Sequence, residues 1–383
     1  MRIFLLLSII TSLLLPTSSY ARTWNVRQDG TGDYTVIQDA VDVAEEGDII
    51  DIGPGWYTDY GTYNNGFGWF ATHVDINTDN LTFIGAGPDQ TIIGPLDIDD
   101  IEIESYGMGH NDDFFLNISG IKFVNLNFSG IYHHYGYLGL DNCEFENSDT
   151  GVYGHFTQGA DIRNCVSRSI FSTAFDCNSP GNGILIEDCL FYDCFQGIRF
   201  DGCDDGRVLA CDFFDGRAPV GYYEGASGEI RDCSMSDFDG YGVVLKLNNF
   251  VSMTDNTIQT EVGESCLYVL SLGNQLISNN VFYGGNYTLS FFNAPQSNFS
   301  FHNNHILRAS GEYIFTPEYY QSFQHLDLTL NYWGTTDLEE IASHIIDGRV
   351  LPNSNFIVDF DPIADGPVST ERTTLDGIKA MFR

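Results

Sequence analysis

One short pattern recurs along the chain between residues 118 and 333: an apolar residue, two polar or small residues, a Cys or Asn, any residue, and a second apolar residue. The Cys or Asn positions are Cys143, Cys165, Cys189, Cys211, Cys233, Asn256, Asn280, Asn304 and Asn331. Successive positions are 22 to 27 residues apart. A period of this length is typical of solenoids, in which each repeat packs only against its neighbours. The repeat therefore predicts one elongated domain and leaves no room for separate globular ones.

Each repeat also contains a second β-type segment, eight to ten residues after the Cys or Asn. Most of these segments begin with Gly and alternate apolar with other residues, as at 130–134, 151–153, 197–200 and 242–245. A leucine-rich repeat has a similar period. It is disfavoured because the position eight residues before the Cys or Asn lacks Leu in the six repeats from Cys143 to Asn256, and because the second half of each repeat is β-type where that fold often has helix. We expect an all-β fold, a right-handed parallel β-helix of about 11 to 12 coils.

The two ends of the solenoid differ from the repeats. Near the N-terminus, Ile37, Ala40, Val41 and Ala44 form the apolar stripe of a short helix that would cover the first coil, with Thr35 as its N-cap and Gly47 as its end. After the Asp-Gly-Pro sequence at 365–367 the pattern stops. The predicted β-helix therefore covers residues 22–363, and residues 364–383 form a C-terminal tail.

The first 21 residues have the features of a secretory signal peptide. Arg2 is followed by an uncharged apolar run over residues 3–15 and by small residues that end at Ala21. No later apolar stretch has the length needed to span a membrane. We therefore expect cleavage after Ala21 and a secreted, extracellular protein that is not inserted in a membrane.

The chain is strongly acidic, with 16 Lys and Arg against 53 Asp and Glu and a formal net charge of −37. Such a surface repels phosphate backbones and anionic lipids, which excludes nucleic acids and membrane surfaces as partners. Two explanations of the charge stay open. It keeps an exported protein solvated, or it captures calcium or another cationic ligand.

The N-terminal part resembles the opening of pectin methylesterases and of the wider pectin-lyase-like superfamily. The resemblance is carried by residues 29–41, 53–57 and 81–87, and residues 331–337 are similar to the last coil of many bacterial right-handed β-helix repeat proteins. It implies an exported β-helix associated with glycans. The catalytic motifs of pectin methylesterases, pectate lyases and polygalacturonases do not occur in the sequence. The resemblance therefore implies no particular reaction.

The five cysteines of the repeat fall on one column of the predicted solenoid. Stacked strands hold equivalent side chains about 4.8 Å apart and parallel, which is a poor approach for a disulfide. We expect buried free thiols, continued by an asparagine column in which Asn256, Asn280 and Asn304 hydrogen-bond along the stack. No Cys and His spacing matches a zinc site.

Alternation along the second strand of each coil predicts which side chains point outward, because Ile131, Val152 and Phe175 are expected to point inward. The outward positions on successive coils are Tyr132, Tyr153, Asp176, Arg199 and Tyr222, with His134, His155, Asn178, Asp201 and Glu224 two residues further on. Aromatic rings stack on sugar faces, and polar groups hydrogen-bond sugar hydroxyls. This strip therefore predicts a carbohydrate-binding surface, and the alternative is an ordinary solvated sheet face.

Asp201 and Glu224 would be neighbours on adjacent coils, about 5 Å apart. That separation suits a pair of carboxylates in a retaining glycosidase, or two ligands of a calcium ion. Three functions stay open at this point. The chain binds extracellular polysaccharide, or it is a polysaccharide lyase, esterase or glycoside hydrolase, or it is a non-catalytic adhesive surface solenoid.

Overall fold

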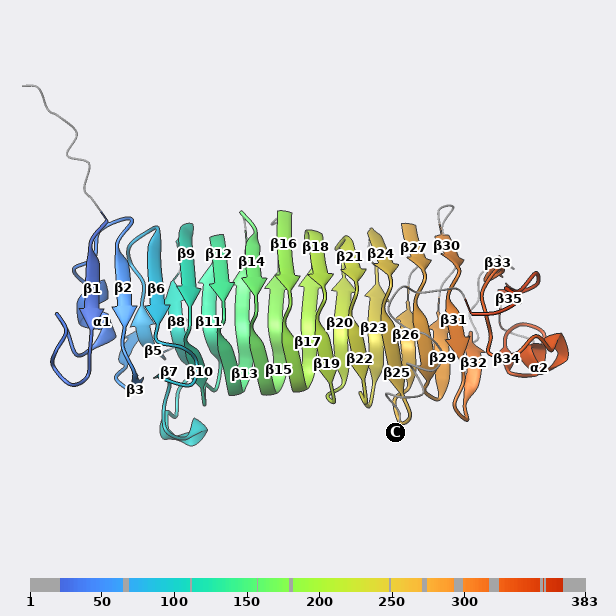
Figure 1. Cartoon of the computed structure of the whole chain (residues 1–383), viewed down its shortest axis with the longest axis horizontal. Helices are drawn as coiled ribbons and strands as arrows, with labels where there is room; N and C mark the ends of the chain where they lie inside the picture. The colour runs from blue at the N-terminus through green and yellow to red at the C-terminus, as the bar shows by residue number, and fades with distance from the viewer. Residues whose placement is uncertain are drawn as a thin grey trace, which may run out of the picture.

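The computed structural model of the chain is a single long β-solenoid, with its coils stacked side by side along the long axis (Figure 1). It describes residues 21–64, 69–110, 112–156, 158–178, 182–247, 249–270, 274–292, 299–316, 324–351, 354 and 356–367. Nearly all of the predicted signal peptide and most of the predicted tail lie outside the described residues.

The first of the two long sheets has twelve parallel strands, one from each coil. In order along the solenoid they are β1 (Thr23–Val26), β2 (Ile49–Ile52), β6 (Leu81–Gly85), β9 (Phe114–Ser119), β12 (Gly136–Asp141), β14 (Ala160–Arg163), β16 (Asn182–Glu187), β18 (Asp204–Leu209), β21 (Gly228–Arg231), β24 (Phe250–Thr254), β27 (Asn274–Ser278) and β30 (Phe299–His302). The predicted right-handed parallel β-helix of about 11 to 12 coils is confirmed by this arrangement of about 12 turns.

The other long sheet receives two segments from most coils. The segments that follow the Cys or Asn column belong to β3 (Gly55–Tyr57), β7 (Thr91–Ile93), β10 (Lys122–Val124), β13 (Glu144–His155), β15 (Val166–Asn178), β17 (Leu190–Asp201), β19 (Asp212–Phe214), β22 (Ser234–Ser236), β25 (Thr257–Thr260), β28 (Val281–Gly284) and β31 (His305–Leu307). In β13, β15 and β17 both segments of the coil join into one long strand. These three strands therefore carry two neighbouring outer faces of the molecule.

The second segments of the other coils are strands of their own. They are β5 (Trp69–Asp75), β8 (Ser105–His110), β11 (Ser129–His134), β20 (Ala218–Tyr223), β23 (Tyr241–Lys246), β26 (Ser265–Val269), β29 (Tyr287–Phe291), β32 (Glu312–Phe315) and β34 (Ile345–Ile346). The remaining elements are β4 (Gly61–Asn64), which pairs antiparallel with β5, the 3-10 turn η1 (Ile98–Asp100), the helix α2 (Leu338–Ser343) and a small sheet of β33 (Gln324–Asp327) and β35 (Phe356–Asp359).

The column of Cys and Asn lies inside the solenoid, as predicted. All nine cysteines are free and buried, and the thiols of the five column cysteines donate to backbone carbonyls, for example Cys189 Sγ to the carbonyl of Glu187 at 3.3 Å. In the asparagine part, the Nδ2 of each residue donates to the Oδ1 of the next, over 2.8 Å from Asn256 to Asn280 and 3.0 Å from Asn280 to Asn304. The predictions of free thiols and of an asparagine ladder are both confirmed.

The N-terminal helix α1 (Ile37–Val41) is shorter than predicted. Its apolar stripe is buried as expected, but its N-cap is Val36, which makes no side-chain capping hydrogen bond, so the prediction of Thr35 is wrong. The predicted end at Gly47 is also wrong. The Asp48 carboxylate accepts the backbone N–H of Glu45 and thereby holds the following segment in a loop.

Candidate functional site

The first outward column runs across four coils in the predicted register. Tyr132 pairs with Tyr153, Tyr153 with Asp176, and Asp176 with Arg199. All four residues are half-buried. The Tyr132 and Tyr153 rings stack with 5.7 Å between their centroids and 5° between their planes. The strands thus place two aromatic rings, a carboxylate and a guanidinium in one row on the outside of the solenoid.

The second outward column lies two residues further along the same strands. His134 pairs with His155, His155 with Asn178, and Asn178 with Asp201. The two imidazoles meet edge to face, with 5.2 Å between the ring centroids. Burial lowers the pKa of His155, so this ring is neutral at pH 7.

The predicted outward position of Tyr222 is wrong. Arg199 pairs with Gly221 and Asp201 with Tyr223, so Tyr222 lies on the inner face beside Phe200. Its ring is fully buried, and its hydroxyl donates to the carbonyl of Gly206 and also lies 3.2 Å from that of Glu229. The step from Arg199 to its true partner is 22 residues, one fewer than the prediction assumed. A one-residue slip in a strand exchanges its two faces.

Glu224 does not lie next to Asp201, so the predicted carboxylate pair is not formed. Glu224 follows the end of β20 in a left-handed conformation with φ of 41°, and its backbone N–H donates to the carbonyl of Lys246. The register places Tyr223 beside Asp201. Among the residues that the structure describes, no three His, Cys, Asp or Glu side chains could hold a metal ion. The proposed calcium ligands Asp201 and Glu224 are therefore a wrong prediction.

Gly221 takes the place opposite Arg199 that Tyr222 was expected to fill, and Tyr223 takes the place opposite Asp201 that was expected for Glu224. Arg199 forms an ion pair with Asp201, and its guanidinium lies 5.4 Å from the centroid of the Tyr223 ring. Gln196 Nε2 donates to the Tyr223 hydroxyl over 3.2 Å. We use the name outer strip for the corrected set of half-buried residues, Tyr132, His134, Tyr153, His155, Asp176, Asn178, Arg199, Asp201 and Tyr223.

Two groups of the outer strip have shifted pKa values. Burial raises the pKa of Asp176; Asp201 adds to this, and Arg199 and the Asn178 amide oppose it. Burial also works against the charged form of Arg199, but the Asp176 and Asp201 carboxylates outweigh it and raise the pKa of Arg199. The centre of the strip therefore holds a fixed cation between two carboxyl groups.

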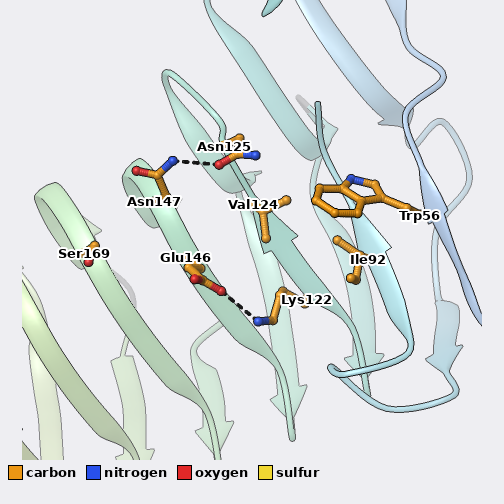
Figure 2. Close-up of a pocket in the computed structure, with 8 residues that line it drawn as sticks. All are labelled: Trp56, Ile92, Lys122, Val124, Asn125, Glu146, Asn147 and Ser169. Atoms are coloured by element: carbon orange, nitrogen blue, oxygen red, sulfur yellow. Dashed lines mark hydrogen bonds and ion pairs between the residues drawn. The ribbon is translucent and has the colours of Figure 1, made fainter. Parts of the chain in front are cut away.

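A hollow surface lies on the neighbouring outer face and was not predicted from the sequence. It is a groove with a volume of about 530 Å³, called the Trp56 groove here (Figure 2). Its walls are formed by Trp56, Ile92, Lys122, Val124, Asn125, Glu146, Asn147 and Ser169. Trp56 pairs with Ile92, and Ile92 with Lys122, so the wall runs across successive coils.

Hydrogen bonds on both sides hold Trp56 in the groove wall. The indole Nε1 donates to the carbonyl of Gly94 over 2.9 Å, and Gln28 Nε2 donates to the backbone carbonyl of Trp56 over 2.8 Å. Gly94 has φ of 137°, and a Cβ there would lie 2.0 Å from the carbonyl oxygen of Val124. Trp56 remains 39% exposed while Tyr57 next to it is buried. The alternation within β3, with Trp56 outward and Tyr57 inward, is the sequence signal that could have pointed to this surface.

The charged groups of the Trp56 groove neutralise one another. Lys122 Nζ lies 2.7 Å from Glu146 Oε2 and 3.1 Å from Glu144 Oε1. Arg168 Nε lies 3.3 Å from the same Glu144 oxygen. Burial disfavours the Lys122 ammonium, but the two glutamates outweigh it and raise the pKa of Lys122. Two cations thus face two carboxylates.

A family match covers more than half of the chain. Residues 106–350 match the family described as "Periplasmic copper-binding protein (NosD)". The chain belongs to the NosD family. No curated protein matches it significantly. No described helix of this NosD-family chain is long and apolar enough to cross a membrane.

The family description mentions copper, but the residues that the structure describes do not form a copper site. All nine histidines and all nine cysteines are among them, and no three potential ligands converge. Two imidazoles do meet, with His110 Nε2 2.7 Å from His133 Nδ1, but both rings are buried in the core. The cysteine thiols are engaged with backbone carbonyls, as at Cys189. The described residues therefore do not fit a copper ion.

Several solved structures resemble the NosD-family chain at low identity. A pectin methylesterase from carrot matches at 14% identity and a TM-score of 0.32, over 88% of both chains. A GH136 lacto-N-biosidase from Eubacterium ramulus matches at 9% and 0.44, over 90% of this chain and 68% of the other. The A-module of the mannuronan C-5 epimerase AlgE4 from Azotobacter vinelandii matches at 12% and 0.33, over 87% and 94%. At this level of similarity none of them indicates a function.

Proposed function

We propose that this NosD-family protein binds a polysaccharide outside the cytoplasm through the outer strip. The observation that carries the proposal is the continuity of the strip. The stacked Tyr132 and Tyr153 rings lead directly, on the same sheet face, to Asp176, Arg199 and Tyr223. Aromatic rings provide contact area for sugar faces, and fixed charged groups orient hydroxyls.

The dimensions of the outer strip suit a chain better than a single sugar. The strip crosses five coils, and adjacent strands of a sheet lie about 4.8 Å apart, so it extends about 20 Å along the solenoid axis. Its side chains are held by one another, as in the Arg199–Asp201 ion pair and the hydrogen bond from Asn178 to Asp176. A ligand would therefore meet groups that are already in place, which lowers the entropy cost of binding.

The location of the proposed ligand follows from two independent indications. The sequence predicts a signal peptide over residues 1–21, and the description of the family is periplasmic. The formal net charge of −37 favours neutral or cationic partners over polyanions. We place the polysaccharide in the periplasm or at the cell exterior.

Glycoside hydrolysis is a second candidate function, favoured by the two carboxyl groups around Arg199. Burial raises the pKa of Asp176, which suits a general acid, whereas Asp201 is ion-paired with Arg199 and suits a charged partner. This candidate would show as release of shorter products from the bound glycan, and Asp176→Asn would abolish that release. A lyase or an esterase would release other products in the same assay.

The proposal is tested by screening the full mature chain on a glycan array, followed by calorimetric titration of each hit. Replacing Tyr153 by Ala should weaken binding by about 1–3 kcal/mol, which is the cost of losing an aromatic anchor. Tyr137→Ala is the matched control, because Tyr137 is a half-buried tyrosine that stacks with Phe115 on the other sheet. Equal affinities of the two variants, or an array without hits, would overturn the proposal and favour a passive adhesive or structural solenoid.

A further inference from the structure

We propose that the Trp56 groove is a separate saccharide-binding site that takes an uncharged stretch of glycan lying along the solenoid axis. This site does not depend on the outer strip, because it is built from other strands and from the first segments of β13 and β15. Figure 2 shows the indole of Trp56 at one end of the groove, the Lys122–Glu146 pair in the middle and Ser169 at the other end.

The Trp56 groove pairs one fixed aromatic ring with an apolar floor. Trp56 is 39% exposed although its Nε1 is hydrogen-bonded to Gly94, so the ring presents apolar surface in a set orientation. Ile92 and Val124 continue the apolar surface on the next two coils. Indole rings suit the C–H face of a pyranose, which is apolar, and a pre-oriented ring loses little entropy on binding.

The groove wall also keeps polar atoms that can bind a ligand. The Lys122 ammonium has three donors, and Glu144 and Glu146 occupy two of them. Asn147 donates through Nδ2 to Asn125 Oδ1 over 2.7 Å, which leaves its own Oδ1 as an acceptor. Donors and acceptors on one wall, opposite an aromatic ring, are the combination that recognises sugar hydroxyls.

The charged side chains of the groove are already paired with one another. The Glu146 carboxylate in the groove wall contacts Lys122, and next to the wall Glu144 contacts both Lys122 and Arg168. An acidic sugar would have to compete with these glutamates for the cations, and a basic sugar would have to compete with the cations for the glutamates. Neither competition arises for a neutral sugar. The groove therefore selects uncharged glycans.

The size and direction of the groove suit a short stretch of glycan. The volume of about 530 Å³ lies within the range of about 300–1,000 Å³ that is usual for ligand pockets, and it exceeds what one sugar residue fills. Trp56, Ile92 and Lys122 follow one another on adjacent strands, about 4.8 Å apart. One residue of an extended glycan advances by a similar distance. A glycan along the axis would therefore place about one sugar on each coil.

The test uses the full mature chain and isothermal titration calorimetry. The probes are neutral hexasaccharides of β-1,4-glucan, β-1,3-glucan, β-1,4-mannan and β-1,4-xylan, and hexagalacturonate as the charged counterpart. We expect at least one neutral hexasaccharide to bind, and Trp56→Ala to weaken it by about tenfold or more, as for the loss of an aromatic anchor. Trp69→Ala is the matched control, because Trp69 is 60% exposed and lies outside the groove.

Two further variants keep the test decisive. Trp56→Phe retains a ring and should keep most of the affinity, which separates a lost stacking surface from a misfolded wall. Tyr153→Ala should leave binding in the groove unchanged, and Trp56→Ala should leave binding at the outer strip unchanged. The inference is overturned if no neutral hexasaccharide binds at millimolar concentration, if hexagalacturonate binds more tightly, or if Trp56→Ala and Trp69→Ala behave alike. None of these outcomes removes the separate prediction for Tyr153.

Discussion

Two adjacent tyrosines, Tyr222 and Tyr223, belong to opposite sides of the same sheet. The Tyr222 ring is fully buried beside Phe200, with 4.8 Å between the ring centroids, and its hydroxyl is held by backbone carbonyls. Tyr223 is half-buried beneath the Arg199 guanidinium on the outer strip. Identical side chains thus contribute to the core at one position and to the candidate site at the next. The register of β20 determines that Tyr222 points into the core and Tyr223 points outward.

Replacing Tyr222 by Ala should give the largest difference between the two positions. The variant leaves a cavity in a closely packed core, and such losses of a buried ring cost about 3–5 kcal/mol of unfolding free energy. Tyr223→Ala should cost less than Tyr222→Ala, about 1 kcal/mol, because the Tyr223 ring is only partly buried on the outer face. Urea unfolding followed by circular dichroism measures both. Equal losses would show that the register in β20 is not the one described.

Two buried histidines on the inner side of the sheet, His110 and His133, should also make stability depend on pH. Burial lowers the pKa of His110 to about 4 and that of His133 to about 3, from an ordinary value of 6.5. Below pH 6.5 these histidines become protonated in the unfolded chain but stay neutral in the folded chain. The free energy of unfolding is therefore highest above pH 6.5 and falls as the pH drops toward 4 and 3. The expected loss at pH 5 is about 2 kcal/mol for each histidine.

The pH effect is measured by urea unfolding at pH 7.5, 6 and 5, with His133→Gln as the comparison. This variant removes one of the two rings and should lose less stability between pH 7.5 and 5 than the unmodified protein does. His325 is a suitable control, because its side chain is 67% exposed, and His325→Gln should keep the original pH dependence. Parallel pH profiles for all three proteins would contradict the account.

The smallest expected effect comes from removing only the two hydroxyl groups. Tyr222→Phe leaves the carbonyls of Gly206 and Glu229 without this buried donor and should cost about 1–2 kcal/mol. Tyr223→Phe loses the hydrogen bond from Gln196 at a half-exposed position and should cost less than about 0.5 kcal/mol. The same unfolding assay resolves the two values. A reversed order would place the buried hydroxyl at position 223.

The sequence predicts the fold well because each coil repeats the same division into inward and outward residues. Up to Arg199 and Asp201 the outward columns agree with the structure, since the step to each new coil could be aligned on the Cys column and on inward residues such as Ile131 and Val152. The next step contains two tyrosines in a row after a glycine. Neither periodicity nor composition distinguishes them, so Tyr222 was placed on the wrong face and Glu224 with it.

The Trp56 groove could not be predicted in the same way. Trp56 precedes the first recognisable repeat at residue 118, and the steps from Trp56 to Ile92 and from Ile92 to Lys122 are interrupted by long irregular segments that include the turn η1. The contact of Lys122 with Glu144 and Glu146 lies within the repeat, between β10 and β13, but it gives no link to Trp56. Alternation within Gly55–Tyr57 gives the outward direction of Trp56 and nothing about its neighbours.

The buried thiols set a kinetic condition on how the protein matures. All nine cysteines end as free thiols in the closed core, yet every one of them is accessible while the chain is unfolded. In an oxidising compartment, two cysteines that join before their coils close would keep a sulfur from reaching its place in the column. There, coil closure would have to be faster than oxidation, and a slowly folding variant would accumulate as disulfide-linked chains even if its final structure were unchanged.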